Sequence, residues 1–318
     1  MNHLLPNLSF GSETNRILDW FRHPMIIIAS RRIKGKKNRI PQLALAFSGA
    51  LSDNKKKKTQ QGGESMIFDT HAHYDSGAFN ADREEVLASM PQKGVGLILN
   101  PGCEAASSRT ALALAERFPF VYAAVGVHPE DMDTLTPDSL KEIRALAMHE
   151  KCVAIGEVGL DYYWDAEHKE EQKKLFAAQL ALAIELDLPV IVHDREAHAD
   201  CLELVSVYPE ARGVFHCFSG SAEMAKEVLR RGWYLGFDGP VTYKNARKSL
   251  EVLQVVPPER ILVETDSPYM SPVPLRGKRN DSSNLVYIIQ KIAEIKGMTP
   301  QEVERITWEN GKRLFGIE

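Results

Sequence analysis

The chain has 318 residues, of which 44% are hydrophobic and 26% charged, and this composition excludes a fibrous or low-complexity protein. The net charge of -4 is unevenly distributed: residues 1–65 carry 12 Lys and Arg against 4 Asp and Glu, whereas residues 66–318 carry 27 against 39. An acidic domain is poorly suited to wrapping nucleic acid nonspecifically, so we expect any nucleic-acid contact to be local.

The cysteines and the lengths of the apolar runs indicate the compartment. The four cysteines are widely spaced and form no Cys-x-x-Cys pair, which favours reduced thiols in the cytoplasm over a disulfide framework or a zinc knuckle. The apolar runs are shorter than the roughly 18 residues that a membrane span needs, so we expect no membrane partner. We expect a monomer, since no obvious association surface marks the sequence.

Residues 1–65 show little periodicity and contain two basic clusters, at 31–39 and 55–58. One interpretation is a basic arm for nucleic acid or a membrane surface. We favour a poorly structured extension that is not naturally translated. Gly62-Gly63-Glu64 can be encoded by a purine run of the ribosome-binding type, so we hypothesise that the natural protein begins at Met66.

From Met66 onward, strand-like and helix-like segments alternate, as in an α/β protein with a parallel sheet. We expect helices at 82–90 with Asp82 as cap, at 137–149 with Pro137 in the first turn, and at 105–117, 167–187, 197–207, 222–231, 245–255, 285–296 and 300–315. We expect strands at 66–68, 95–100, 121–127, 153–157, 189–193, 213–216, 233–237 and 261–265.

Eight strand–helix units within residues 66–318 match the size of a (β/α)8 TIM barrel, which is about 250 residues. An open doubly wound sheet is the alternative. It gives no reason for side chains from strands one, four, five, six and eight to converge, whereas a closed barrel does. The sequence therefore predicts one barrel domain over residues 66–318.

Side chains that can bind metal follow five of the expected strands. His71 and His73 come after the first strand, and side chains two apart on an extended backbone point to the same side. An isolated His-x-His pair is as often structural, but the pattern recurs at the ends of later strands, with Glu157, His193, His216 and Asp266. A barrel gathers these ends on one face. We therefore predict a metal site at the C-terminal ends of the strands.

Five motifs in this order resemble those of the TatD family of metal-dependent deoxyribonucleases and related hydrolases with amidohydrolase-like barrels. They are DTHAH (69–73), GEVGLDYY (156–163), LPVIVH (188–193), HCFSG (216–220) and ETDSPY (264–269). The resemblance covers residues 66–318. One departure is Asp281-Ser282, where family members usually have Glu-Pro, and it bears on substrate preference more than on chemistry.

The resemblance implies two divalent metal ions. It assigns one ion to His71, His73 and Asp266 and the other to His193 and His216, with Glu157 bridging both. Asp266 and Glu157 are then the catalytic carboxylates, and Asp266 could orient or deprotonate the attacking water. Magnesium, manganese and zinc all remain open, because imidazoles favour zinc or manganese whereas related nucleases are associated with magnesium.

Four further residues are candidates for substrate binding. Arg276, Arg279 and Arg195 could hold phosphates, since a guanidinium group presents a planar fork to phosphate oxygens. The alternative for each is a solvated surface charge. His128 follows the third expected strand and resembles a family motif, so it could line the substrate pocket; the alternative is a structural histidine.

Other polar and aromatic residues lie beside the expected ligands. The aromatic residues 162–164 could stack on bases, although core packing is their commoner role. Asp161 and Glu264 could orient imidazoles. We expect Cys217 to point to the opposite face of its strand from His216 and leave it out of the site.

Three functions fit these residues. The first is a deoxyribonuclease that trims single-stranded or frayed 3′ ends of DNA in the manner of a 3′-5′ exonuclease. The second is a metal-dependent esterase or deacylase, such as one that removes D-amino acids from mischarged tRNA. The third is a non-catalytic nucleic-acid-binding protein with a vestigial site, although the presence of all six ligands argues against it.

Overall fold

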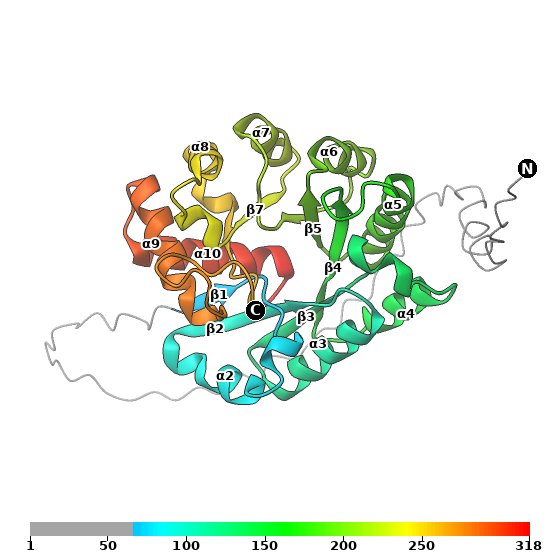
Figure 1. Cartoon of the computed structure of the whole chain (residues 1–318), viewed down its shortest axis with the longest axis horizontal. Helices are drawn as coiled ribbons and strands as arrows, with labels where there is room; N and C mark the ends of the chain where they lie inside the picture. The colour runs from blue at the N-terminus through cyan, green and yellow to red at the C-terminus, as the bar shows by residue number, and fades with distance from the viewer. Residues whose placement is uncertain (1–65) are drawn as a thin grey trace, which may run out of the picture. The chain divides into compact units, whose positions relative to one another are not determined.

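The computed structural model describes residues 66–318; the expectations for residues 1–65, including a start at Met66, lie outside the described residues. Eight parallel strands lie in the order β1 to β8 and form a nearly closed barrel, with helices arranged around it (Figure 1). The prediction of a TIM barrel is confirmed. The strands are β1 (Ile67–Asp69), β2 (Val95–Pro101), β3 (Val121–Val125), β4 (Cys152–Asp161), β5 (Val190–Arg195), β6 (Gly213–Phe215), β7 (Tyr234–Phe237) and β8 (Ile261–Val263).

The helices are α2 (Arg83–Ser89), α3 (Ala105–Arg117), α4 (Ser139–Leu146), α5 (Lys169–Leu186), α6 (His198–Val207), α7 (Ala222–Arg230), α8 (Arg247–Val255), α9 (Leu285–Lys296) and α10 (Pro300–Phe315). Helices α2 to α8 connect successive strands around the outside, and α9 and α10 follow the last strand. Six short 3-10 turns lie between them: η1 (Gly77–Phe79), η2 (Pro91–Lys93), η3 (Pro129–Thr134), η4 (Gly239–Thr242), η5 (Pro258–Arg260) and η6 (Ser282–Asn284). Among the described residues, no helix is both long and apolar enough to cross a membrane.

One expectation for a helix start is wrong, and a second is confirmed in position but not in its side-chain contact. Pro137 lies outside α4, which begins at Ser139. Asp82 precedes α2 but its side chain makes no capping hydrogen bond, because the carboxylate pairs with Arg279 instead. By contrast, Thr299 caps α10 through a reciprocal capping box with Glu302, which fits the predicted start of that helix.

Strand β4 continues four residues beyond its predicted end at Glu157 and finishes at Asp161. The pairing of β4 with β5 shifts register between Ile155 and Val158, and this irregularity contains Glu157. A bulge of this kind changes the direction of a side chain without ending the strand. Glu157 therefore points into the site from the middle of a strand, and Asp161 marks its end.

The barrel closes between β1 and β8 without a regular ladder. Just beyond the strands, the Asp266 amide donates to the His71 carbonyl at 2.9 Å, and the His73 amide donates to the Ser267 carbonyl at 2.7 Å. Ala72 and Ser267 form an isolated parallel bridge. Three predicted metal ligands thus lie on the two chain segments that close the barrel.

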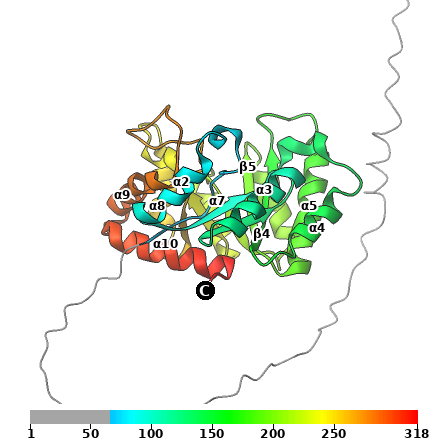
Figure 2. The ribbon, with the colours of Figure 1, turned by 90° about the horizontal axis from the view of Figure 1, so that it is seen from below.

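Two apolar clusters build the core. The larger lies between strands and helices, and the smaller takes a side chain from every strand and fills the barrel interior. Helix α10 runs along the lower edge of the barrel in Figure 2, and its Phe315 packs against Phe68 of β1 at 6.0 Å between ring centroids. This packing closes the end of the barrel opposite the carboxyl ends of the strands.

Candidate metal centre

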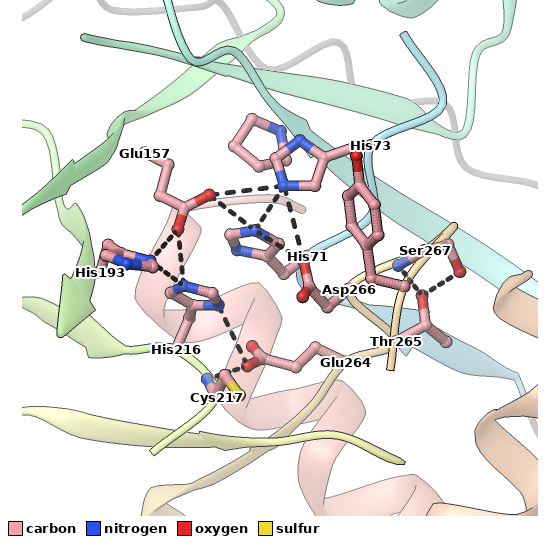
Figure 3. Close-up of polar contacts among 12 residues, drawn as sticks. His71, His73, Glu157, His193, His216, Cys217, Glu264, Thr265, Asp266 and Ser267 are labelled. Atoms are coloured by element: carbon pink, nitrogen blue, oxygen red, sulfur yellow. Dashed lines mark hydrogen bonds and ion pairs between the residues drawn. The ribbon is translucent and has the colours of Figure 1, made fainter. Parts of the chain in front are cut away.

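The six predicted metal ligands lie together at the carboxyl ends of the strands (Figure 3). Five of them are buried, and the sixth, His193, has a side chain that is 15% exposed. Imidazoles and carboxylates that converge in a buried space need a cation or a proton to offset their electrostatic cost. The structure therefore brings the predicted ligands into one cluster.

Glu157 lies at the centre of this cluster, with one oxygen facing each pair of imidazoles (Figure 3). Its Oε2 lies 3.1 Å from His71 Nε2 and 3.4 Å from His73 Nε2. Its Oε1 lies 2.9 Å from His193 Nδ1 and 2.6 Å from His216 Nε2. A carboxylate that divides its two oxygens between two sets of nitrogens has the arrangement of a bridging metal ligand.

Asp266 completes the set on the His71 side. Its Oδ1 lies 3.7 Å from His71 Nε2 and 3.6 Å from His73 Nε2, and those two nitrogens are 3.0 Å apart. His216 also approaches this side, because its ring stacks on that of His71 with centroids 4.0 Å apart. The donor atoms of His71, His216 and Asp266 all lie within 4.8 Å of one another, so His216 is placed to serve either half of the cluster.

A buried carboxylate holds the two closing segments in register. Asp69 Oδ1 accepts the backbone amides of His71 and Thr265 at 3.3 and 3.0 Å, and its Oδ2 accepts the Thr265 hydroxyl at 2.6 Å. Because Thr265 directly precedes Asp266, Asp69 fixes the positions of His71 and Asp266 relative to each other.

Two more carboxylates contact the imidazoles from outside the cluster. Asp161 Oδ2 lies 3.0 Å from His193 Nε2, on the side of the ring away from Glu157. Glu264 Oε1 lies 3.8 Å from His216 Nδ1. The geometry supports the orienting role expected for Asp161, because a hydrogen bond on one ring nitrogen fixes the ring and directs the other nitrogen.

Burial and neighbouring charges set the protonation of these groups. Burial lowers the pKa of every imidazole in the cluster, but neighbours that include Glu157 raise it overall for His73, His193 and His216, so a bound cation would displace their protons. Burial lowers the pKa of His71 to about 3, with His216 adding to the effect, so this imidazole is neutral and offers a lone pair. Burial alone would raise the pKa of Glu157, but the surrounding imidazoles, His216 first, hold it well below its usual value. Burial raises the pKa of Asp266, with partial opposition from His73. A carboxylate of raised pKa accepts a proton more readily than an ordinary one.

A cavity of about 810 Å³ opens above the cluster. Of the predicted substrate-binding residues, His128 and Arg195 line it. His128 Nε2 lies 3.6 Å from Glu157 Oε1, and burial lowers the pKa of His128 to about 4, so this ring is neutral. The structure thus places His128 at the edge of the candidate centre.

The other two predicted phosphate-binding residues lie outside the cavity wall. Arg276 lies over the Tyr243 ring, with its Cζ 4.4 Å from the centroid. Arg279 pairs with Asp82 at 2.6 Å and donates to the Ala78 carbonyl at 3.0 Å. The structure does not bring either guanidinium group to the cluster.

The expectation that leaves Cys217 out of the site is wrong, because this residue lines the cavity. Strand β6 ends at Phe215, and Cys217 has a φ of 42°, so strand alternation does not apply to it. Sequence reasoning also missed several cavity residues. These are Cys103, Glu130, Asp131, Asp194 and Asp238. Asp238 directly follows β7, so the strand-end rule that found the ligands could have found it.

A parallel barrel with histidines and carboxylates clustered at its strand ends defines the class of metal-dependent hydrolases. A family model described as TatD related DNase matches residues 68–316. The chain belongs to the TatD family. It is 44% identical to the uncharacterized metal-dependent hydrolase YabD of Bacillus subtilis, over 79% of this chain and 100% of that protein.

Two further comparisons agree with this assignment. A protein of Cronobacter sakazakii named 3′-5′ ssDNA/RNA exonuclease TatD is 38% identical, over 78% of this chain and 97% of its own length. The crystal structure of YJJV, a TatD homolog from Escherichia coli K12, superposes with a TM-score of 0.77 and 32% identity. That match covers 80% of this chain and 100% of YJJV.

Proposed function

We propose that this metal-dependent hydrolase is a nuclease that removes nucleotides from the 3′ ends of single-stranded DNA. The observation that carries the proposal is Glu157, which divides its two oxygens between two pairs of imidazoles at the base of an open cavity. Two ions held at these groups would supply chemistry suited to phosphodiester cleavage. The name of the Cronobacter relative supports a single-stranded substrate and a 3′ start.

In this proposal two divalent ions occupy the cluster. His71, His73 and Asp266 would hold one ion and His193 and His216 the other, with Glu157 placed to serve both. The donor set fits because imidazole nitrogens and carboxylate oxygens meet from several sides within 4.8 Å of one another. When bound, such ions activate a water and stabilise the leaving oxygen.

The chain's own groups supply the remaining requirements. The buried Asp266 carboxylate lies beside the place that the ions would take, so it is positioned to accept the proton of the attacking water. Asp161 holds the His193 ring in one orientation from the side opposite Glu157. His128 is neutral and lines the cavity beside Glu157, so it is placed to donate a hydrogen bond to a substrate oxygen.

The shape of the site favours a chain end. The cluster is buried at the bottom of a cavity whose volume suits one or two nucleotides rather than an intact duplex. A single-stranded or frayed 3′ end can enter such a cavity without unstacking a duplex. This is why we favour an exonuclease over an enzyme that cuts internally.

The proposal also places a monomer in the cytoplasm. All four cysteines are free, and Cys152 and Cys201 are buried, which suits a reducing compartment.

The test compares two labels on one single-stranded oligonucleotide. With magnesium, manganese or zinc added in turn, a 5′ label should yield a descending ladder, whereas a 3′ label should be released first as a mononucleotide. Asp266→Asn should abolish both. Asp187→Asn is the matched control, because Asp187 is an exposed residue in the left-handed region, which asparagine also adopts. Absence of cleavage with every metal, in a protein shown to hold its ions, would contradict the nuclease and leave other esters as substrates.

A further inference from the structure

Two large aromatic side chains are exposed at the rim of the cavity. Tyr163 is 51% exposed and Trp164 is 62% exposed, and Trp164 lines the cavity itself. Their rings meet edge to face, with centroids 4.9 Å apart. Aromatic side chains of this size normally gain stability by burial, so an exposed pair at a cavity mouth indicates a binding surface.

The pair is held rigidly to the metal centre. Asp161 Oδ1 accepts the backbone amides of both Tyr163 and Trp164 at 2.9 Å, while its Oδ2 contacts His193 Nε2 at 3.0 Å. One carboxylate therefore orients an imidazole of the centre and fixes the aromatic turn beside it. A surface fixed in this way keeps a constant distance from the reacting bond.

Arg195 joins the two rings from the neighbouring strand. Residue Asp161 at the end of β4 pairs with Arg195 at the end of β5, and the Tyr162 amide donates to the Arg195 carbonyl at 2.9 Å. The Arg195 Cζ lies 4.1 Å from the Tyr163 ring centroid and 5.4 Å from that of Trp164. Stacking on these rings holds the guanidinium group at the rim.

The charge around Arg195 indicates what it binds. Among the described residues that line the cavity, Arg195 is the only lysine or arginine, whereas the carboxylates include Glu130, Asp131, Asp194 and Asp238. Within the described chain no side chain forms a hydrogen bond or ion pair with its guanidinium group, and its charge opposes the burial that raises the pKa of the neighbouring Glu130. Its planar donors are therefore available for an anion that approaches the acidic cavity.

We infer that Trp164, Tyr163 and Arg195 form a nucleotide subsite in which an unstacked base lies on Trp164 and the adjacent phosphate pairs with Arg195. The inference rests on the proposed nuclease function and names the part of the substrate that the chain recognises beyond the scissile bond. Base stacking on an aromatic ring requires an unpaired base, so the subsite selects single strands over duplexes.

Binding is measured with the full chain loaded with manganese. The probe is an eight-nucleotide oligothymidylate with a 5′ fluorophore and phosphorothioate linkages at its 3′ end, which resist cleavage. A second probe has the same backbone but lacks the bases of its last three nucleotides. Trp164→Ala should weaken binding of the intact probe about tenfold or more, and should leave binding of the abasic probe at the wild-type level. Trp164→Phe should retain affinity for the intact probe within about threefold, since the ring remains.

Met148→Ala is the matched control for loss of an exposed apolar side chain, because Met148 is 72% exposed and lies between α4 and β4, away from the cavity. Equal affinity of Trp164→Ala and wild type for the intact probe would overturn the subsite. Equal loss on both probes would overturn it as well, because the variant would then act on something other than the base.

The role of Arg195 has its own readout. Arg195→Ala should reduce the slope of log affinity against log salt by about 0.7, the value for one phosphate contact on a single strand. Arg212→Ala is the control, since Arg212 pairs with Asp187 near the amino end of β6. If Arg195→Ala has the same salt slope as the wild type, Arg195 does not contact a phosphate. The two proposals can fail separately. If the wild type trims DNA with metal but Trp164→Ala binds the intact probe as tightly as wild type, the subsite is refuted and the nuclease stands. If binding depends on the bases but no nucleotide is released, the nuclease is refuted and the subsite stands.

Discussion

Glu157 is the residue whose loss should affect both halves of the metal centre. The Glu157→Gln side chain has the same size, but it carries no charge and offers only one oxygen, so at least one set of imidazoles loses its carboxylate partner. We predict that this variant retains less than about half of the metal bound by the wild type, measured by atomic emission after gel filtration. Glu185→Gln is the control, because Glu185 is exposed and, in the part of the chain that the structure describes, its ion pair is with Arg144, away from the cluster. Undiminished metal content in Glu157→Gln would show that this carboxylate is not a ligand.

A variant of Asp161 tests whether orienting the His193 imidazole matters, because Asp161 is not itself one of the predicted metal ligands. Asp161→Asn retains an oxygen for the amides of Tyr163 and Trp164 but presents an NH₂ group where His193 Nε2 now meets a carboxylate oxygen. We predict a 10- to 100-fold loss of activity or metal affinity, the usual effect of removing such a partner. Asp165→Asn, in the following turn, should have no such effect, since within the described residues the Asp165 carboxylate contacts His168 and the Glu167 amide and does not reach His193. Activity and metal affinity within twofold of wild type would argue against the orienting role of Asp161.

The sequence predicts which metal-capable side chains come together better than it predicts which arginines line the cavity. The ligands follow apolar strands, and the strand period determines which way they point, so local pattern is enough to find them. Arg279 shows the limit: its partner Asp82 is 197 residues away in the chain, and nothing local to either residue predicts the pairing. Strand alternation fails for Cys217 because β6 is only three residues long and ends before it.

At the scale of the elements, β4 and β5 approach so closely at Gly159 that no larger residue fits. A Cβ at Gly159 would lie 1.9 Å from the His193 carbonyl oxygen, whereas one at Gly232 would meet nothing within 4 Å, although both glycines have positive φ. We predict that Gly159→Ala lowers the free energy of unfolding by more than about 3 kcal/mol and displaces His193. Gly232→Ala should cost only the left-handed strain of about 1–2 kcal/mol.

Urea unfolding followed by circular dichroism distinguishes these two glycine variants, and metal content shows whether His193 has moved. Similar unfolding free energies for both would mean that β5 can shift away from β4 without cost. The sequence predicts the existence of both strands, but it does not predict their register shift around Glu157. That shift depends on pairing between two segments rather than on the pattern within either one.

At the scale of the whole molecule, metal binding should stabilise the fold, because the cluster joins strand ends from across the barrel. A ligand that binds only the folded state at a hundred times its Kd adds about 2.7 kcal/mol. For a domain of this size we therefore predict that a chelator lowers the Tm by about 5–10 °C and that added manganese or zinc restores it. The Glu157→Gln variant should respond much less. An identical Tm with and without chelator in the wild type would contradict a metal centre that links these strands.

The overall architecture could be predicted because eight strand–helix units of the right total length leave few alternatives. The way in which the barrel closes could not be predicted from the sequence. The segments after β1 and β8 are held by Asp69, Thr265 and single backbone hydrogen bonds, and these contacts join residues almost 200 positions apart. Such contacts arise from the folded arrangement, so no local periodicity predicts them.

The most direct measurement of the proposed activity is a titration of metal-free full-length chain with manganese, in which bound ions per chain and release of 3′-terminal nucleotides are recorded on the same samples. If two ions act together at Glu157, nucleotide release should be slow at one ion per chain and should rise steeply as the second ion binds. Full activity at one ion per chain, or activity in the metal-free chain, would contradict the two-ion nuclease.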